Sequence, residues 1–517
     1  MEPTPSSPTR RRAQLRGSHR VPRLRTSCPS ARKLVGRPSS TPNRKIVSRL
    51  DSNTHPESTM AVPTMDLTKE DGSMLTSRQK GLIALAVGGN MLEFLDYYLI
   101  GFILNLIIGP WHLSFGASAL ILLSSGLGAI VGAFAWGALA DKIGRRPCFI
   151  GTIVTFSVAT GLMIFIPFGA WHVLALLRFV VGFGVGGLAI VDVPYIQEFV
   201  PSRVRGRIGG LVVAFIPIGL LLGSLTASLL GDSVGWHGLV LVGLLPALLL
   251  LPFRSKVPES PRWLQSKGRI ADAKKSIAWA VNCDPADVVL PEVDSNAVKP
   301  RWRDMFKNRR SVVVSWFMSL GTQTAEYGVI LWGPALLTMI LGVTAEKAAF
   351  MFIFVSLTGF AARLIGSWLA DKVGRRLPGM VACSAGAAGL VVTALLKDHY
   401  LGPVPVFYLG IIVTFFFLDG VFALTTNYFG EMFPTSMRTS GTGAAYGFGS
   451  IGKILGPGCL VLISGAGTVV TPKATAEATL PAFVFMAAFS LLAAVMFYFG
   501  RETRDKTIEQ IDAEFAN

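Results

Sequence analysis

The sequence predicts an all-α membrane protein with twelve transmembrane helices arranged in two six-helix halves. Three observations predict this fold class: the composition, the number of long apolar runs and an internal repeat. Of the 517 residues, 51% are hydrophobic and 15% are charged, and the mean hydropathy is +0.52. Such values are typical of chains that cross a membrane many times.

A helix that crosses the hydrocarbon core of a bilayer needs roughly 20 mostly apolar residues. Runs of this kind between Gly81 and Gly500 predict twelve spans. In order, they cover residues 81–108, 117–139, 148–168, 172–197, 207–230, 236–253, 311–336, 346–369, 377–396, 404–429, 439–464 and 480–500.

Residues 1–79 precede the first span and form a basic arm. Its first 50 residues hold thirteen Lys and Arg and one acid, Glu2. Because the arm is rich in Arg, Ser and Pro and has no apolar core segment, we expect disorder rather than a secretory signal or a nucleic-acid domain. Two alternatives stay open: translation starts at Met60, Met65 or Met74, so that residues 1–59 are not made, or the arm is a mitochondrial-type presequence.

Basic residues gather in alternate loops, and such loops stay on the cytoplasmic side. Both termini and the loop at 254–310 are therefore expected in the cytoplasm, most simply at a plasma or inner membrane. The basic residues that indicate this orientation are Lys142, Arg145, Arg146, Arg203, Arg205, Arg207, Lys372, Arg375 and Arg376.

Two motifs occur twice. L-A-D-K-I-G-R-R at 139–146 recurs as L-A-D-K-V-G-R-R at 369–376, and E-F-V-P-S-R-V-R at 198–205 recurs as E-M-F-P-T-S-M-R at 431–438. The offsets of 230 and 233 residues predict a duplicated unit. We expect six-helix bundles at 80–253 and 311–500, a cytoplasmic linker at 254–310 and a cytoplasmic tail at 501–517.

These motifs resemble those of the major facilitator superfamily. G-A-L-A-D-K-I-G-R-R looks like its characteristic loop, and P-E-S-P-R-W-L at 258–264 and R-E-T-R-D-K-T-I-E-Q-I at 501–511 resemble motifs of its sugar-porter-like branches. The resemblance covers about residues 80–512. It implies the major facilitator fold and a transporter that is not an enzyme.

The repeated motifs place acids beside arginines at the cytoplasmic ends of the helices. We expect a cytoplasmic gate that closes in the outward-facing state and opens as the halves rock. A simpler alternative is that the basic turns only fix the topology. The expected gate residues are Asp141, Arg145, Arg146, Glu198, Arg205, Asp371, Arg375, Arg376, Glu431 and Arg438.

Ionisable residues inside the spans cost roughly 2.5 to 3.5 kcal/mol each and usually have a function. Glu93 and Asp96 share one face of the first span by their spacing, and Arg178 in the fourth span lies at a similar depth. We therefore expect Glu93, Asp96 and Arg178 to couple transport to protons. The alternative is a static buried pair that fixes the first helix against the fourth.

The segment E-F-L-D-Y-Y-L-I-G-F resembles the first helix of the aromatic-acid/proton symporters, with Glu93 and Asp96 at its two acidic positions. The expected spans at 311–336, 404–429 and 439–464 supply the opposite wall of the binding site. Lys453 is expected either to neutralise a substrate carboxylate or to pair with Asp419 or Glu326. Asp192 and Arg363 are expected nearer the gate. The expected substrate-binding residues are Asn90, Gln323, Glu326, Tyr327, Trp332, Asp419, Tyr446 and Lys453.

The sequence thus favours a secondary transporter that moves a small organic acid, with an aromatic carboxylate as one candidate, together with protons by alternating access. A sugar or polyol porter, an uncoupled facilitator and a drug exporter of the same fold are the alternatives. Five scattered cysteines, Cys28, Cys148, Cys283, Cys383 and Cys459, have neither metal-ligand nor disulfide spacing. We expect no metal, no cofactor and no nucleic acid, and a monomer in the bilayer.

Overall fold

The computed structural model describes residues 75–290, 302–434, 437–504 and 510. The expectations for the basic arm up to residue 74, for part of the linker and for most of the tail fall outside these residues.

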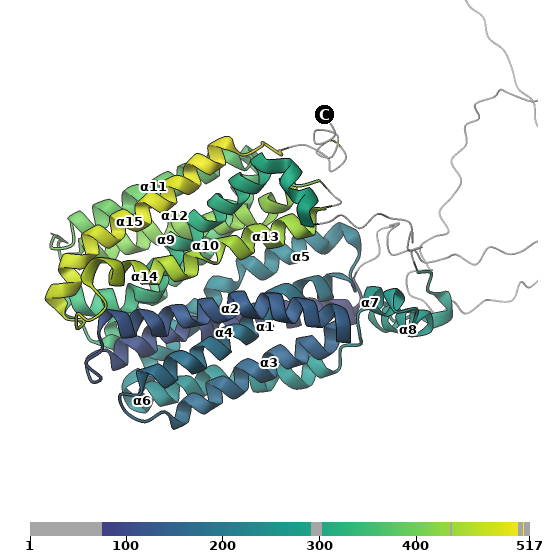
Figure 1. Cartoon of the computed structure of the whole chain (residues 1–517), viewed down its shortest axis with the longest axis horizontal. Coiled ribbons are helices and arrows are strands. Elements are labelled where there is room, and N and C mark those ends of the chain that lie inside the picture. Colours follow the sequence, from purple (N-terminus) through teal and green to yellow (C-terminus); the bar gives the residue numbers. More distant parts are fainter. Residues whose placement is uncertain (1–74, 291–301, 435–436, 505–509, 511–517) are drawn as a thin grey trace, which may run out of the picture. The chain divides into compact units, whose positions relative to one another are not determined.

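The first half of the chain folds into a bundle of long helices that run side by side (Figure 1). Lipid cannot satisfy backbone N–H and C=O groups, so apolar runs of this length become helices. Side-chain caps begin two of them, at Ser114 and at Thr76, whose hydroxyl accepts from the N–H of Gln79. The helices are α1 (Ser77–Ile107), α2 (Phe115–Ile143), α3 (Arg145–Leu162, extended by the 3-10 turn Met163–Phe165), α4 (Trp171–Gln197), α5 (Ser202–Ala214) and α6 (Ile216–Ser255).

Helix α6 contains parts of two spans. At Gly235 the backbone has φ 61° and ψ −172°, a conformation that side-chain-bearing residues rarely adopt. The apolar stretch Ile208–Ser255 is 48 residues long, enough to cross a membrane twice. Among the described residues eleven segments are long and apolar enough to span a membrane, and the division at Gly235 makes twelve. The predicted fold class is confirmed.

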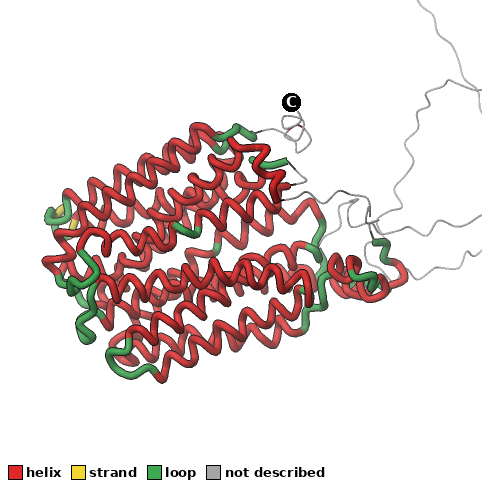
Figure 2. The backbone as a smooth tube through the Cα atoms, viewed as in Figure 1, coloured by secondary structure: helices red, strands yellow, loops and turns green. Residues whose placement is uncertain are grey.

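The second half repeats this arrangement, and nearly all of its described chain is helical (Figure 2). The helices are α9 (Arg309–Leu341), α10 (Ala345–Val373), α11 (Arg376–Leu395), α12 (Val406–Glu431), α13 (Arg438–Gly449), α14 (Gly452–Ser464) and α15 (Pro472–Phe499). A short hairpin joins α11 to α12. Its strands, β1 (Tyr400–Leu401) and β2 (Val404–Pro405), have two residues each.

The span expected at 439–464 is broken, which the apolar pattern did not predict. Helix α13 ends at Gly449 and α14 begins at Gly452. The hydroxyl of Ser450 donates to the carbonyl of Tyr446 at 3.0 Å, a side-chain bond that tends to bend helices. Glycines on both sides of Ser450 lower the helix propensity further.

We call the end of the bundle that carries Arg145 and Arg375 the basic end, and the opposite end the far end. The segment between the two halves contains two short helices and two 3-10 turns. In chain order they are α7 (Pro261–Ser266), α8 (Ile270–Val281), Pro285–Asp287 and Trp302–Asn308. Helix α8 is attached to the start of α1, where the hydroxyl of Thr76 donates to the carbonyl of Ala280 at 2.6 Å.

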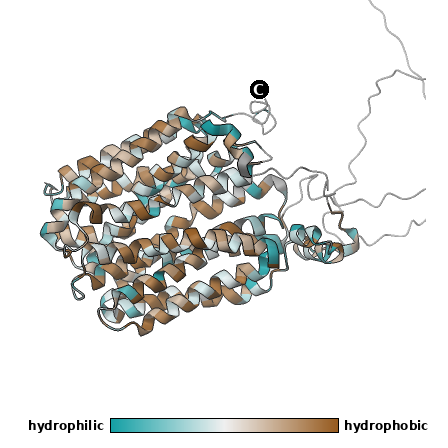
Figure 3. Ribbon diagram, in the orientation of Figure 1, coloured by the Kyte–Doolittle hydropathy of each residue, from teal (hydrophilic) through white to brown (hydrophobic). Residues whose placement is uncertain are grey.

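Small residues let helices within a half approach closely. A Cβ atom on Gly182 of α4 would lie 2.0 Å from the carbonyl oxygen of Ser125 on α2, so only glycine fits there. Large apolar side chains instead cover the outer surface, where Phe134 is 68% and Phe165 80% exposed. Brown, hydrophobic ribbon accordingly runs along the outer helices (Figure 3). This surface is suited to lipid contact.

Candidate functional site

A cavity of about 1010 Å³ lies between the two halves. Both halves line it, because α1, α4 and α5 form one wall and α9, α10, α12 and α13 form the other. Arg375, Glu431 and Arg438 line it at the basic end. Its inner wall includes Asn90, Phe94, Tyr98, Gln323, Glu326, Tyr327 and Tyr446.

At the far end the two halves are joined directly. The Asn105 amide on α1 donates to the Thr338 hydroxyl on α9 at 2.9 Å. The N–H of Phe115 at the start of α2 donates to the carbonyl of Thr468, between α14 and α15, at 2.8 Å. The far end is therefore closed by contacts between the halves, whereas the cavity reaches the basic end.

Asp96 on α1 and Arg178 on α4 form a buried ion pair with 3.4 Å between Oδ2 and NH1. Both residues are almost fully buried. The Thr160 hydroxyl donates to Asp96 at 3.4 Å, and Arg178 donates to the Ser125 hydroxyl at 3.1 Å and the Tyr97 carbonyl at 3.2 Å. The charges of this pair balance, and neither side chain lines the cavity.

Glu93 has a different partner from the one expected. Its Oε1 lies 2.5 Å from NH2 of Arg254, whose NH1 lies 2.8 Å from Oδ2 of Asp192. A step of three residues turns a helix by about 300°, so Glu93 and Asp96 diverge by about 60° and contact different helices. Asp192 therefore belongs to this buried cluster rather than to the gate.

A similar cluster occupies the second half. Arg363 on α10 binds the Asp419 carboxylate on α12 with two hydrogen bonds of 2.9 and 2.7 Å, and its NH2 lies 3.6 Å from Oε1 of Glu326 on α9. All three residues are at most 1% exposed. Glu326 and Arg363 line the cavity, but Asp419 does not. Arg363 thus lies beside the cavity and not at the gate.

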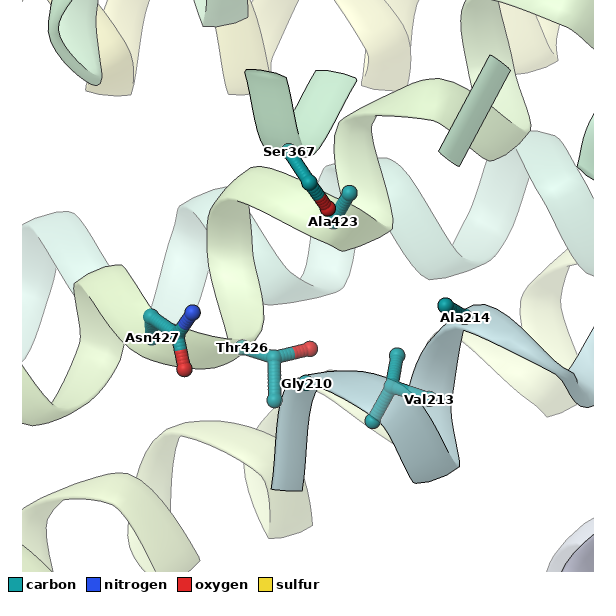
Figure 4. Close-up of a pocket in the computed structure, with 7 residues that line it drawn as sticks. All are labelled: Gly210, Val213, Ala214, Ser367, Ala423, Thr426 and Asn427. Carbon is teal, nitrogen blue, oxygen red and sulfur yellow. The ribbon is translucent and has the colours of Figure 1, made fainter. Parts of the chain in front are cut away.

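Arg363 also contacts the opposite half. Its NH1 donates to the carbonyl of Val213 on α5 at 2.6 Å. That carbonyl lacks its usual helical partner, because the residue four positions later is Pro217, which has no N–H. A small pocket of about 20 Å³ lies beside this contact, between Val213 and Ala214 of α5 and residues of α10 and α12 (Figure 4).

Lys453, just after the break between α13 and α14, is 6% exposed. Its ammonium group donates to the Tyr446 hydroxyl at 3.2 Å and lies 4.9 Å from the ring centre of Tyr327. It forms no ion pair with Asp419 or Glu326, the two acids that the sequence offered as partners. Lys453 itself does not line the cavity, but both tyrosines do, so the positive charge lies behind an aromatic wall.

The remaining expected binding residues differ in position. Asn90 Oδ1 and Gln323 Oε1 are buried without a hydrogen-bond partner, and both side chains line the cavity. Trp332 instead is fully buried away from it, and its indole N–H donates to the Pro457 carbonyl at 2.9 Å. Trp332 therefore packs α9 against α14 and does not line the described cavity.

At the basic end, the first half forms a compact network. Arg145 pairs with Glu198 at 2.6 Å, and the Ser260 hydroxyl donates to the same carboxylate. The Glu259 carboxylate accepts from the N–H groups of Arg145 at 2.9 Å and Arg146 at 3.1 Å. These N–H groups begin α3, where a helix terminus attracts negative charge.

The second half repeats this network. Arg375 pairs with Glu431 at 3.1 Å, and the Thr503 hydroxyl donates to Glu431. Glu502 accepts from the N–H groups of Arg375 and Arg376 at the start of α11, at 3.1 and 3.2 Å. Partial burial acts to raise the pKa of Glu502, but the backbone N–H donors outweigh it and hold this pKa below its usual value.

The other expected gate residues make local contacts within their own half. Asp371 lies 3.8 Å from Arg375, and the side chain of Asp141 is exposed. The ion pairs of the expected gate residues therefore form within each half and not across the cavity. The arginines donate to nearby carbonyls: Arg146 to Ser255, Arg205 to Val200, Arg376 to Tyr498 and Arg438 to Gly430.

Arg254 was not expected as a site residue, because the expected linker begins at this position. No role was expected for Glu259 and Glu502 either. The offset of 233 that relates Glu198 to Glu431 also relates Asn90 to Gln323, which both line the cavity, and Glu93 to Glu326, of which only Glu326 lines it.

Comparison with known proteins agrees with this architecture. Residues 82–515 match the family described as "Sugar (and other) transporter". The chain belongs to this family. It is a major facilitator superfamily transporter, as the repeated motifs indicated, and not an enzyme.

Several relatives of this transporter have names that state their own substrates. The niacin transporter of Acinetobacter baylyi is 29% identical over 438 residues, 82% of this chain and 94% of that protein. The cis,cis-muconate transport protein of the same organism is 28% identical over 75% of this chain and 87% of that protein. The xylose transporter from E. coli, in a partially occluded inward open conformation, is 19% identical with a TM-score of 0.64, covering 84% of this chain and 100% of that one, and shows the fold alone.

Proposed function

We propose that this transporter moves a small aromatic or related organic carboxylate together with protons. The observation that carries the proposal is Lys453, a buried cation next to the cavity whose hydrogen-bond acceptor is the neutral Tyr446 hydroxyl. A buried charge is costly unless it is paired, so this ammonium favours an anionic ligand.

The walls of the cavity suit an aromatic ring. Tyr98, Tyr327 and Tyr446 line it, and the rings of Tyr97 and Tyr327 already pack edge to face with centres 5.9 Å apart. A substrate ring can pack against such rings in the same way. The partnerless oxygen atoms of Asn90 and Gln323 would accept hydrogen bonds from hydroxyl or ring N–H groups.

The names of the relatives support the same class. Niacin is an aromatic carboxylic acid, and cis,cis-muconate is an unsaturated dicarboxylate. Both substrates are small and planar and can present a carboxylate to a lysine. The proposed substrate of this chain therefore shares a planar skeleton and at least one carboxylate with them.

We infer that the protein works by alternating access. The basic end faces the cytoplasm by the distribution of positive charge, so the arrangement described above is open inward and closed outward. Opening the far end requires the Asn105 to Thr338 contact and the Phe115 to Thr468 contact to break. The Arg145 and Arg375 networks, each within one half, would then move as rigid units.

Asp96 and Arg178 remain the proposed proton-coupling pair of the first half. The buried pair is balanced when Asp96 is ionised, so a proton binds there only when the helices separate the two charges. This step requires the pair to reach water in another conformation, because neither side chain lines the cavity described here.

Uptake into proteoliposomes tests the proposal. We expect nicotinate, benzoate or muconate to accumulate when the outside is acidic, and xylose and a quaternary ammonium compound to be excluded. Lys453→Met should abolish this uptake, whereas Lys473→Met, at an exposed position at the start of α15, should not. Accumulation of xylose in preference to every carboxylate would overturn the proposal.

A further inference from the structure

Glu326 differs from the other buried acids of the described chain in where it lies. Glu93, Asp96, Asp192 and Asp419 are shielded from the cavity, whereas Glu326 lines it. Its Oε2 atom is buried without any hydrogen-bond partner. A carboxyl oxygen in this state has a free site for a proton and a path to water through the cavity.

The charges around Glu326 balance only in the absence of substrate. Asp419 takes both short hydrogen bonds of Arg363, so Glu326 at 3.6 Å shares that cation weakly. Lys453 supplies the second positive charge and interacts electrostatically with Glu326. With Glu326 ionised, two acids and two bases sum to zero. The charged and titratable groups that interact with Glu326 are Arg363 of α10, Asp419 of α12, Lys453 of α14 and Tyr98 of α1, together with the adjacent Tyr327.

A substrate carboxylate at Lys453 would disturb this balance. It would add one negative charge to a buried group of side chains and occupy the ammonium that offsets Glu326. Since a buried excess charge is expensive, the cluster lowers its free energy by taking up one proton. Glu326 is the acid placed to receive it, because Asp419 is held by two hydrogen bonds and lies outside the cavity.

We propose that Glu326 is a second proton-binding site, which takes up one proton for each substrate carboxylate that binds at Lys453. This inference rests on the proposed function, because it requires an anionic substrate. Substrate and proton would enter the same site from the same side as a neutral pair. Transport of this pair would move no net charge across the membrane, and the concentration gradient of protons would drive it.

Proton uptake on binding can be measured directly. Nicotinate and benzoate would be titrated into purified protein by calorimetry, in buffers with different ionisation enthalpies. We expect the wild type to take up about one proton per ligand near neutral pH, so affinity should rise by up to about tenfold for each unit that the pH falls.

Variants separate this inference from the proposed function. Glu326→Gln should still bind the carboxylate but without taking up a proton or depending on pH. Glu326→Asp should restore proton uptake, and Glu477→Gln, at an exposed position on α15, should match the wild type. If no carboxylate binds the wild type, the proposed function fails. If carboxylates bind without proton uptake, or if Glu326→Gln retains the uptake, the assignment to Glu326 is overturned.

Discussion

Glu93 and Glu326 occupy equivalent positions in the two halves, 233 residues apart, and each lies beside a buried arginine that also binds an aspartate. The partners come from different helices: Arg254 is on α6, and Arg363 is on α10. The two halves therefore share a glutamate at this position but differ in the helix that supplies its arginine counterion. Only the second cluster has members that line the cavity, Glu326 and Arg363, and for this reason we propose proton binding there and a structural role for the first cluster.

The first cluster should depend on its single cation. Arg254→Met leaves two buried carboxylates uncompensated, so we expect the free energy of unfolding to fall by about 3 to 5 kcal/mol. Adding Glu93→Gln and Asp192→Asn to this variant should recover most of the loss. Thermal unfolding in detergent measures both, with Arg269→Met, at an exposed position just before α8, as control. Equal stability of the wild type and Arg254→Met would contradict the role of Arg254.

Asp96→Asn should abolish gradient-driven accumulation. The change removes the carboxylate that balances Arg178 and the proton acceptor that we propose in the first half. Exchange of labelled for unlabelled substrate requires no net proton movement and should persist. The measurement is uptake into proteoliposomes before and after collapse of the proton gradient. Unchanged, gradient-dependent accumulation by Asp96→Asn would refute coupling through Asp96.

Pro217→Ala should weaken the connection between the halves. The new N–H can donate to the Val213 carbonyl, which then no longer needs Arg363 as its donor. We expect slower transport with unchanged proton uptake on substrate binding, because Glu326, Arg363 and Asp419 remain in place. Calorimetry and uptake assays on the same preparation check the two effects. A loss of binding-linked proton uptake would instead place this contact inside the proton site.

The far end should open when a side chain is added at Gly101. A Cβ atom there would lie 2.9 Å from the carbonyl oxygen of Leu331, so Gly101→Val forces α1 and α9 apart. We expect a cysteine substituted for Asn105 to become reactive toward a membrane-impermeant reagent added outside. Gly109→Val is the control, since no atom lies within 4 Å of a Cβ there. Equal labelling in the two variants would contradict the closure.

The Glu502 contact should stabilise the fold in a pH-dependent manner. Because its pKa is held below 4.5, the stabilisation is fully present above that value and is lost as the pH falls through the folded-state pKa. The unfolding temperature of Glu502→Gln should therefore lie below that of the wild type at neutral pH and approach it in acid. A constant difference across this range would exclude the carboxylate as the cause.

Much of the architecture was determined by the sequence, because its causes are local. Apolar length predicted the spans, and the repeated motifs predicted the two halves and the family. Helix rise along α1 and α4 brought Asp96 to the depth of Arg178, where they lie 3.4 Å apart. Each of these inferences uses a distance along one helix or a pattern within one segment.

Only the tertiary structure decided which buried charges meet. The orientation of α1 about its axis points Glu93 toward Arg254, a residue 161 positions away that donates a hydrogen bond to it. The packing of α10 against α12 brings Arg363 to Asp419, and Lys453 hydrogen-bonds the Tyr446 hydroxyl instead. Sequence spacing sets the depth of a side chain in the membrane but not the neighbouring helix that it faces. That choice depends on how the helices pack, and the packing determines which acid lines the cavity.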